Sequence, residues 1–242
     1  MTTARISPAT LTGELAPRLS RWLWLVKWVL VFPHAFLLFF LSIAAFFTTI
    51  IAGFAILFTG RYPRSLFDFA VGVLRWNWRV AFYSYSALGV DKYPPFTLQK
   101  TDYPADFDVE YPEKLINGLV LVKWWLLAIP HYLVLALIVG ATYNWSPRTD
   151  SPADRPLADA GRWGHYLGAD STPGLLAILV LIAAVILLFT ARYPQALFDF
   201  VMGLNRWVYR VYAYVFLLTD AYPPFRLDQG ATEPPTIAPT KA

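Results

Sequence analysis

Long apolar stretches dominate the pattern of hydrophobic and polar positions along the chain. They cover residues 22–58, 115–141 and 175–189 and carry almost no charge. A helix needs about 20 apolar residues to cross the hydrocarbon core of a bilayer. The pattern therefore predicts an integral membrane protein whose apolar stretches are helices.

A different pattern follows the first and third apolar stretches. Residues 66–87 and 197–218 are apolar except at a few positions, which recur at spacings of four, three and four. Such spacings place the polar residues on one side of an α-helix, so each segment is predicted to be an amphipathic helix with a narrow polar stripe. The stripes are Asp68, Gly72, Arg75 and Arg79, and Asp199, Gly203, Arg206 and Arg210.

The chain also repeats itself. Residues 58–79 read FTGRYPRSLFDFAVGVLRWNWR and residues 189–210 read FTARYPQALFDFVMGLNRWVYR, and a YPPF tetrapeptide follows each, from Tyr93 and from Tyr222. A duplication this close predicts two tandem copies of one membrane unit. We divide the chain into a polar tail (1–20), repeat 1 (21–98), an acidic linker (99–113), repeat 2 (114–227) and a disordered tail (228–242).

The spacing of the two repeats differs at an inserted segment. Repeat 2 carries about 30 extra residues at 143–173, rich in Pro, Asp, Gly and Ser and therefore expected to form a loop. The equivalent point in repeat 1 lies near Ser42 to Ala45, within an apolar stretch that would be roughly 55 Å long as one helix, nearly twice the bilayer core. We therefore expect each repeat to begin with a helical hairpin. A continuous helix bent at Pro33 is the alternative for repeat 1.

The position of the amphipathic helices decides the number of membrane crossings. Each of their four arginines would cost about 2.5–3.5 kcal/mol near the bilayer centre. If these helices lie at the surface instead, both termini and 15 of the 20 basic residues share one side, as cytoplasmic segments do. We expect an all-α integral membrane protein of two repeats, each a transmembrane helical hairpin plus an interfacial amphipathic helix. The alternative has six transmembrane helices, three per repeat.

Composition agrees with a membrane protein and excludes several kinds of site. Hydrophobic residues make up 57% of the chain and charged residues 15%, whereas soluble domains contain about 25% charged residues. There is no cysteine, so disulfides and thiolate metal sites are excluded. The basic residues are dispersed among apolar segments, which argues against nucleic acid as a partner.

These motifs resemble those of the bacterial domain-of-unknown-function 4389 family of short polytopic membrane proteins. The resemblance rests on RYP-x-x-LFDF, on RW-x-x-R and on the terminal YPPF, and it covers residues 21–98 and 115–227. It implies a multi-pass protein of the bacterial inner membrane, and we expect both termini to be cytoplasmic. It names no catalytic or binding residue.

The two RYP sequences stand where an apolar helix ends and the next helix begins. One interpretation is a rigid corner; the other is a site where arginine and the helix start hold an anionic lipid headgroup. The residues assigned to structure or ion pairing are Tyr62, Pro63, Asp68, Tyr193, Pro194 and Asp199.

The arginines of the polar stripes also allow two interpretations, lipid binding or ion pairing within the protein. A guanidinium group suits phosphate, and a basic residue near the membrane attracts anionic lipid by about 1 kcal/mol. The other interpretation pairs these arginines with aspartates across the repeats. The residues predicted to contact lipid or a partner are Arg61, Arg64, Arg75, Trp76, Arg79, Arg192, Arg206, Trp207 and Arg210.

His34 and His131 follow prolines within the first apolar stretch of each repeat. Ionisable groups within a membrane are candidates for function, and two equivalent histidines could form a proton-linked pair. The structural interpretation is that each histidine satisfies a carbonyl freed by the neighbouring proline. Two histidines without carboxylates nearby fall short of a metal site, so no metal or cofactor is expected.

No motif of a known enzyme class appears in the chain. We therefore expect a non-enzymatic membrane accessory or scaffold protein that contacts anionic lipid headgroups, a larger membrane complex or a second copy of itself. A small transporter or channel with a proton path through His34 and His131 is the alternative.

Overall fold

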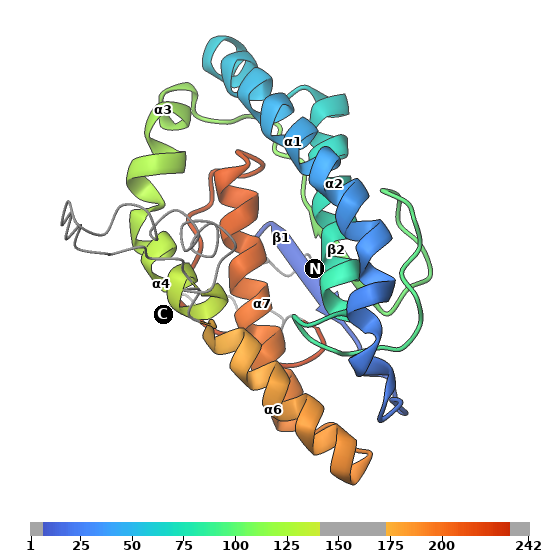
Figure 1. Cartoon of the computed structure of the whole chain (residues 1–242). Coiled ribbons are helices and arrows are strands. Elements are labelled where there is room, and N and C mark those ends of the chain that lie inside the picture. The colour runs from blue at the N-terminus through green and yellow to red at the C-terminus, as the bar shows by residue number, and fades with distance from the viewer. Residues whose placement is uncertain (1–6, 141–172, 233–242) are drawn as a thin grey trace, which may run out of the picture.

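Helices make up most of the fold, and a two-stranded sheet lies between them (Figure 1). The computed structural model describes residues 7–140 and 173–232. Its elements are β1 (Ala9–Gly13), the 3-10 turn η1 (Leu23–Leu25), α1 (Lys27–Thr59), α2 (Arg64–Tyr83), β2 (Ala105–Val109), the 3-10 turn η2 (Asn117–Leu119), α3 (Val120–Val122), the π-helical turn η3 (Lys123–Leu127), α4 (Ile129–Val139), α6 (Leu175–Thr190) and α7 (Gln195–Val215).

The sheet corrects the prediction of an all-α fold. β1 comes from the N-terminal tail and β2 from the linker, and they pair antiparallel with Leu11 opposite Phe107. Buried and partly exposed residues alternate along both strands, which is the period of two that a half-buried strand requires. The sequences ATLTG and ADFDV carry this alternation, but each is only five residues long.

The first apolar stretch is one continuous helix, α1, and the hairpin predicted in repeat 1 is absent. No glycine or proline lies near Ser42 to break the helix, and α1 continues through Pro33, its seventh residue. The helix ends at Gly60, which adopts the left-handed conformation with φ 68°, where glycine carries no Cβ penalty.

The four expected crossings are not supported by the number of suitable helices. Within residues 7–140 and 173–232, α1 alone is long and apolar enough to cross a membrane by itself. A second candidate exists if residues 117–127 and 129–139, which meet at an angle of 45°, are counted as one bent span. With 16 residues, α6 is shorter.

In repeat 2, α4 and α6 together take the place of α1. Nine positions separate His131 from Gly140 and eighteen separate Gly174 from Arg192, which together equal the twenty-seven between His34 and Arg61. A Cβ at Gly174 would overlap the backbone of Gly140, so the two helix ends abut. In Figure 1, α6 leads away from the end of α4 and does not return along it. The predicted loop at 143–173 therefore interrupts a long helix; all but Pro173 of it lies outside the described residues.

A one-residue difference between the repeats explains the π-helical turn. Seven positions separate Lys27 from His34, but eight separate Lys123 from His131. All four side chains are buried, so repeat 2 must absorb the extra residue without rotating His131 away from the core. The wider turn of η3 does this, since a π-bulge accommodates one inserted residue in a helix.

We therefore expect deletion of Leu126 to be tolerated. Leu126 is an exposed residue of η3, and its removal restores the spacing of repeat 1 by turning η3 into a regular helix. Deletion of the exposed Phe36 from α1 removes one residue between His34 and Leu38 and should destabilise the fold. Thermal unfolding in detergent, followed by circular dichroism, compares the two variants. A larger loss on deleting Leu126 would contradict this role of η3.

The amphipathic helices predicted at 66–87 and 197–218 are present as α2 and α7, but they occupy the interior of the protein. Trp78 of α2 packs against Tyr209 of α7, with ring centroids 5.2 Å apart, and Tyr209 donates a hydrogen bond to Asn77 at 2.7 Å. α1 packs on α2, and α6 packs on α7. The apolar helices α1 and α6 therefore cover α2 and α7 from outside.

Candidate functional site

The two RYP sequences form matching rigid corners. After α1, the Thr59 hydroxyl accepts a hydrogen bond from the backbone N–H of Arg61 at 3.2 Å and donates one to Ala55 O at 2.7 Å. Thr190 makes the same pair of bonds, to the N–H of Arg192 and to Ile186 O. The tyrosines point inward, whereas Arg61 and Arg192 are exposed. Pro63 and Pro194 cap the start of α2 and α7.

The aspartates of the stripes pair locally. Asp68 forms an exposed salt bridge with Arg64, one turn earlier in α2, at 3.1 Å. Asp199 accepts a hydrogen bond from Gln195, also one turn earlier, at 2.8 Å. Neither pairs with the arginines of the stripes in the described part of the chain, so the predicted pairing of Asp68 and Asp199 across the repeats is corrected.

The stripe arginines are buried and hold the two strands against the central helices. Arg75 Nε donates to Phe107 O at 2.9 Å, and Arg206 Nε donates to Leu11 O at 3.1 Å. Leu11 and Phe107 are paired opposite each other in the sheet. The two arginines therefore bind neighbouring points of the sheet from equivalent positions in the two repeats.

Additional acceptors surround each arginine. Arg75 forms salt bridges with Asp106 at 3.1 Å and Asp108 at 2.9 Å, and Arg79 lies 3.4 Å from Asp106. In repeat 2, Arg206 donates to the carbonyl oxygens of Asp228 and Gly230.

Arg210 completes this layer by binding the Asp228 carboxylate at 2.5 Å. The prediction that these four arginines face lipid is therefore corrected: they bind the linker, the N-terminal strand and the segment that follows the second YPPF. The four are Arg75, Arg79, Arg206 and Arg210.

Each predicted histidine lies in an aromatic box built by its own repeat. The Trp76 indole N–H donates to His34 Nδ1 at 3.1 Å, and Phe96 stacks on the imidazole with centroids 3.9 Å apart. His131 has the same surroundings: Trp207 donates at 3.3 Å, and Phe225 stacks at 4.5 Å. The YPPF tetrapeptides therefore close these boxes.

These two boxes place Trp76 and Trp207 in the interior of the protein. The prediction from the sequence that both tryptophans contact lipid is therefore corrected. Because each Nδ1 accepts a hydrogen bond, the imidazole is neutral with its proton on Nε2. The Nε2 atoms of both histidines are buried without a partner among the described residues. In the same part of the chain, no three His, Asp or Glu side chains are grouped to hold a metal.

Two buried lysines form sites that sequence reasoning missed. Lys27 Nζ lies 3.0 Å from Asp91 and donates to Val90 O at 2.6 Å. Lys123 Nζ lies 2.8 Å from Asp220. Each aspartate stands two positions before a YPPF tetrapeptide, so the repeated motif D-x-YPPF could have predicted a partner for each lysine.

The outer helices expose large apolar side chains along most of their surface. Eight phenylalanines of α1 are between 54% and 80% exposed, whereas the buried positions form one narrow stripe. Leu133 and Leu137 of α4 and Phe189 of α6 are exposed in the same way. An apolar surface this extensive exceeds what soluble monomers tolerate. The exposed phenylalanines are Phe32, Phe36, Phe39, Phe40, Phe46, Phe47, Phe54 and Phe58.

Burial raises the pKa values of several tyrosines that pack in the central layer. The pKa of Tyr62 rises to about 12, and that of Tyr214 rises to about 12, chiefly through burial and secondarily through Tyr222 and Asp220. Burial also holds the pKa of Tyr209 well above its ordinary value of 10.0. The neutral form of each is therefore favoured in the folded protein.

Stability should fall in alkaline solution for this reason. Below about pH 10 these tyrosines add no pH dependence to the stability, because they are protonated in both the folded and the unfolded chain. Above about pH 10 they lose their protons in the unfolded chain but keep them in the folded protein. In this range each tyrosine lowers the free energy of unfolding by about 1.4 kcal/mol per pH unit. Replacing Tyr209 by phenylalanine should make the decline above pH 10 shallower. Unfolding midpoints measured against pH test this, and an unchanged slope would contradict it.

One family model matches the chain. The model of the domain of unknown function DUF4389 matches residues 21–97 and 173–226. The first segment contains α1, α2 and the first YPPF, and the second contains α6, α7 and the second YPPF. The two segments cover more than half of the chain, and two tandem copies account for them. No curated protein and no solved structure matches the chain.

Proposed function

This chain belongs to the DUF4389 family, and we propose that it is a non-enzymatic accessory or scaffold protein embedded in the bacterial inner membrane. The observation that carries the proposal is the apolar surface of α1, α4 and α6. Its large side chains are exposed in the part of the chain that the structure describes, and lipid acyl chains are the solvent that suits them.

The geometry favours helices that lie along the membrane plane over helices that cross it. α1 has 33 residues and is therefore about 50 Å long, which exceeds the hydrocarbon thickness of about 30 Å. The polar linker runs alongside the α1–α2 pair. At one end Arg75 of α2 donates a hydrogen bond to Leu98 O, and at the other end Tyr111 donates one to the carbonyl oxygen of Tyr62.

A crossing α1 would carry this linker into the bilayer. The linker includes strand β2 of the two-stranded sheet and exposed charged residues such as Lys100, Asp102 and Glu110. Open sheet edges do not occur in contact with hydrocarbon. We therefore propose that α1 and the α4–α6 helix lie in one leaflet with their phenylalanines and leucines in lipid. The multi-pass arrangement predicted from the sequence remains the rival.

In this arrangement the exposed arginines of the corners are available for headgroups. Arg61 and Arg192 each follow the end of an apolar helix, and Arg64 lies one turn further on, beside Asp68 and over the Tyr111 ring at 4.5 Å. Anionic phospholipid or an acidic surface of a larger membrane complex suits them. The transporter alternative gains no support, since the two histidines lie in separate aromatic boxes.

Two measurements test this function. Vesicle binding should weaken about a hundredfold on replacing Arg61, Arg64 and Arg192 together by glutamine, as expected for about 1 kcal/mol per basic residue, and only when phosphatidylglycerol is present. Asp102→Asn is the control that alters charge elsewhere. Purification of the tagged full chain in mild detergent should recover a membrane protein partner or a defined oligomer. A monodisperse single chain that is indifferent to anionic lipid would overturn the proposal.

A further inference from the structure

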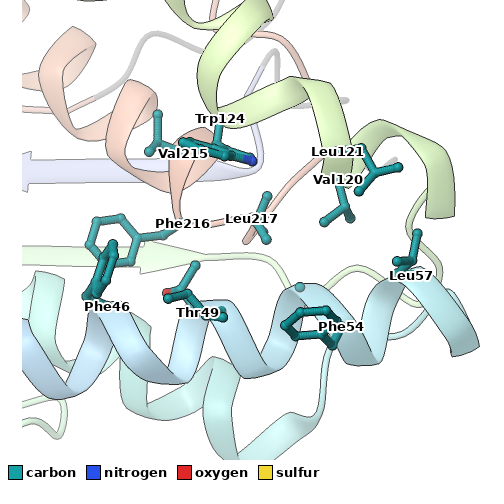
Figure 2. A pocket seen from close by; sticks show the side chains of 12 residues that line it. Phe46, Thr49, Phe54, Leu57, Val120, Leu121, Trp124, Val215, Phe216 and Leu217 are labelled. Atoms are coloured by element: carbon teal, nitrogen blue, oxygen red, sulfur yellow. The ribbon is translucent and has the colours of Figure 1, made fainter.

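An apolar cavity lies where the two repeats meet. Its volume is about 400 Å³, within the range of sites that bind small ligands. Six lining residues come from the second half of α1, three from α3 and η3, and three from the last residue of α7 and the turn that follows it (Figure 2). In Figure 2, Trp124 and Leu121 lie across the cavity from Thr49 and Phe54.

The wall offers an occupant almost no polar group. Thr49 carries the one hydroxyl of the lining, and this group donates to Ala45 O at 2.7 Å. The indole Nε1 of Trp124 is the other polar side-chain atom of the lining (Figure 2). An occupant must therefore be a hydrocarbon, with at most one acceptor close to Trp124.

The cavity is continuous with the exposed apolar surface. Five lining residues are themselves among the exposed hydrophobic side chains of α1, α3 and η3: Phe46, Ile50, Phe54, Leu121 and Trp124. When these helices lie in lipid, the cavity opens to acyl chains and not to water. An empty cavity would forfeit dispersion contacts along its whole lining, and water would find no polar partners there.

We propose that this cavity binds one acyl chain of a membrane phospholipid, whose ester carbonyl accepts a hydrogen bond from Trp124 Nε1. The chain fills the space between α1, η3 and the end of α7 and so joins the two repeats through a lipid. This inference rests on the proposed membrane embedding. It adds a specific lipid site to what would otherwise be a uniform apolar surface.

Gly53 offers a way to fill the cavity without disturbing its walls. A Cβ added there would lie 3.4 Å from Leu217 and 3.6 Å from Val120, which are ordinary van der Waals distances. Gly53→Phe would then place a ring in the space assigned to the acyl chain. Ile50→Trp narrows the cavity from its exposed side and is the second variant if Gly53→Phe fails to fold. Ala35→Phe, an exposed α1 position outside the lining, is the matched control.

Photo-crosslinking from vesicles tests the proposal. The full chain is reconstituted with phosphatidylglycerol or phosphatidylethanolamine that bears a diazirine on its acyl chain, and crosslinked peptides are mapped. We expect the peptides of residues 46–57, 120–124 and 215–217 to be labelled above other exposed apolar segments. An excess of unlabelled phospholipid should reduce that labelling, and either cavity variant should lower it at least fivefold, while Ala35→Phe leaves it unchanged.

The outcomes separate the lipid site from the membrane proposal. Labelling spread evenly over α1, α4 and α6, and unaffected by Gly53→Phe and Ile50→Trp, would overturn the lipid site and leave membrane embedding intact. Displacement by free fatty acid but not by phospholipid would overturn the assignment to a membrane phospholipid. Absence of labelling on every apolar helix would overturn the membrane proposal itself.

Discussion

Replacing both Phe47 and Phe54 of α1 by glutamate should release the protein from lipid vesicles. Both side chains are exposed and lie on one face of the helix, seven residues apart. A charged residue placed in the bilayer costs about 2.5–3.5 kcal/mol on insertion scales. The pair therefore costs about 5–7 kcal/mol, which lowers partitioning at least a thousandfold.

Vesicle flotation after cell-free synthesis measures this effect. The unmodified chain should float with vesicles, and the double variant should remain in the soluble or aggregated fraction. Ser65→Glu with Gln99→Glu, which adds the same charge at exposed polar positions, should float like the unmodified chain. If the Phe47 and Phe54 variant floats equally well, α1 does not face lipid.

Replacing Arg206 by alanine should produce the largest loss of folding stability of any arginine substitution. Its guanidinium group is fully buried and donates to Leu11 O at 3.1 Å and Gly230 O at 2.9 Å, as well as to Asp228 O. Removing it leaves buried carbonyl oxygens without donors, each at a cost of about 1–3 kcal/mol. A total of about 3–5 kcal/mol corresponds to a fall of roughly 6–20 °C in the unfolding midpoint.

Two further variants show whether this loss comes from the hydrogen bonds. Arg206→Lys keeps the charge but cannot reach acceptors on separate segments as the planar guanidinium does, so we expect it to recover less than half of the stability. Arg192→Ala removes an exposed arginine and should change stability by less than about 0.5 kcal/mol. Equal midpoints for Arg206→Ala and Arg192→Ala would contradict the anchoring role.

The repeat and its central helices could be predicted from the sequence because the signals are local. The spacing of Asp68, Arg75 and Arg79 fixes a helical face wherever the helix lies, and the RYP corner combines a helix end with a proline. The same local signal led to the wrong prediction that this helical face lies at the membrane surface. Arginines beside apolar residues suit both a membrane surface and a buried layer, and the choice depends on acceptors far away in the chain.

Those acceptors could not be found by periodicity. Arg206 binds the backbone carbonyls of Leu11 and Gly230, one far before it and one after it in the chain. Every residue has a backbone carbonyl, so no residue type identifies these acceptors in the sequence. The strand partners of the sheet are also almost 100 positions apart. By contrast, Asp91 and Asp220 recur before each YPPF, so the partners of Lys27 and Lys123 did leave a signal.

The hairpin error arose from reading repeat 1 through repeat 2. The loop in repeat 2 does not imply a turn in repeat 1, because Ser42 to Ala45 contains no residue that breaks a helix. In the structure α1 is continuous, and the corresponding helix of repeat 2 is divided between α4 and α6. The one-residue excess that η3 absorbs was visible as unequal Lys to His spacings.

The depth of α1 in the bilayer tests the account most directly. Because the chain has no cysteine, single cysteines at positions 36, 43, 47 and 54, all on the outer face of α1, can each carry a nitroxide label without further changes. Accessibility to oxygen and to a water-soluble paramagnetic reagent then gives the depth of each label in vesicles. We predict the same depth at all four positions. A depth that is greatest at the middle positions and shallow at both ends would show that α1 crosses the membrane and would contradict the account.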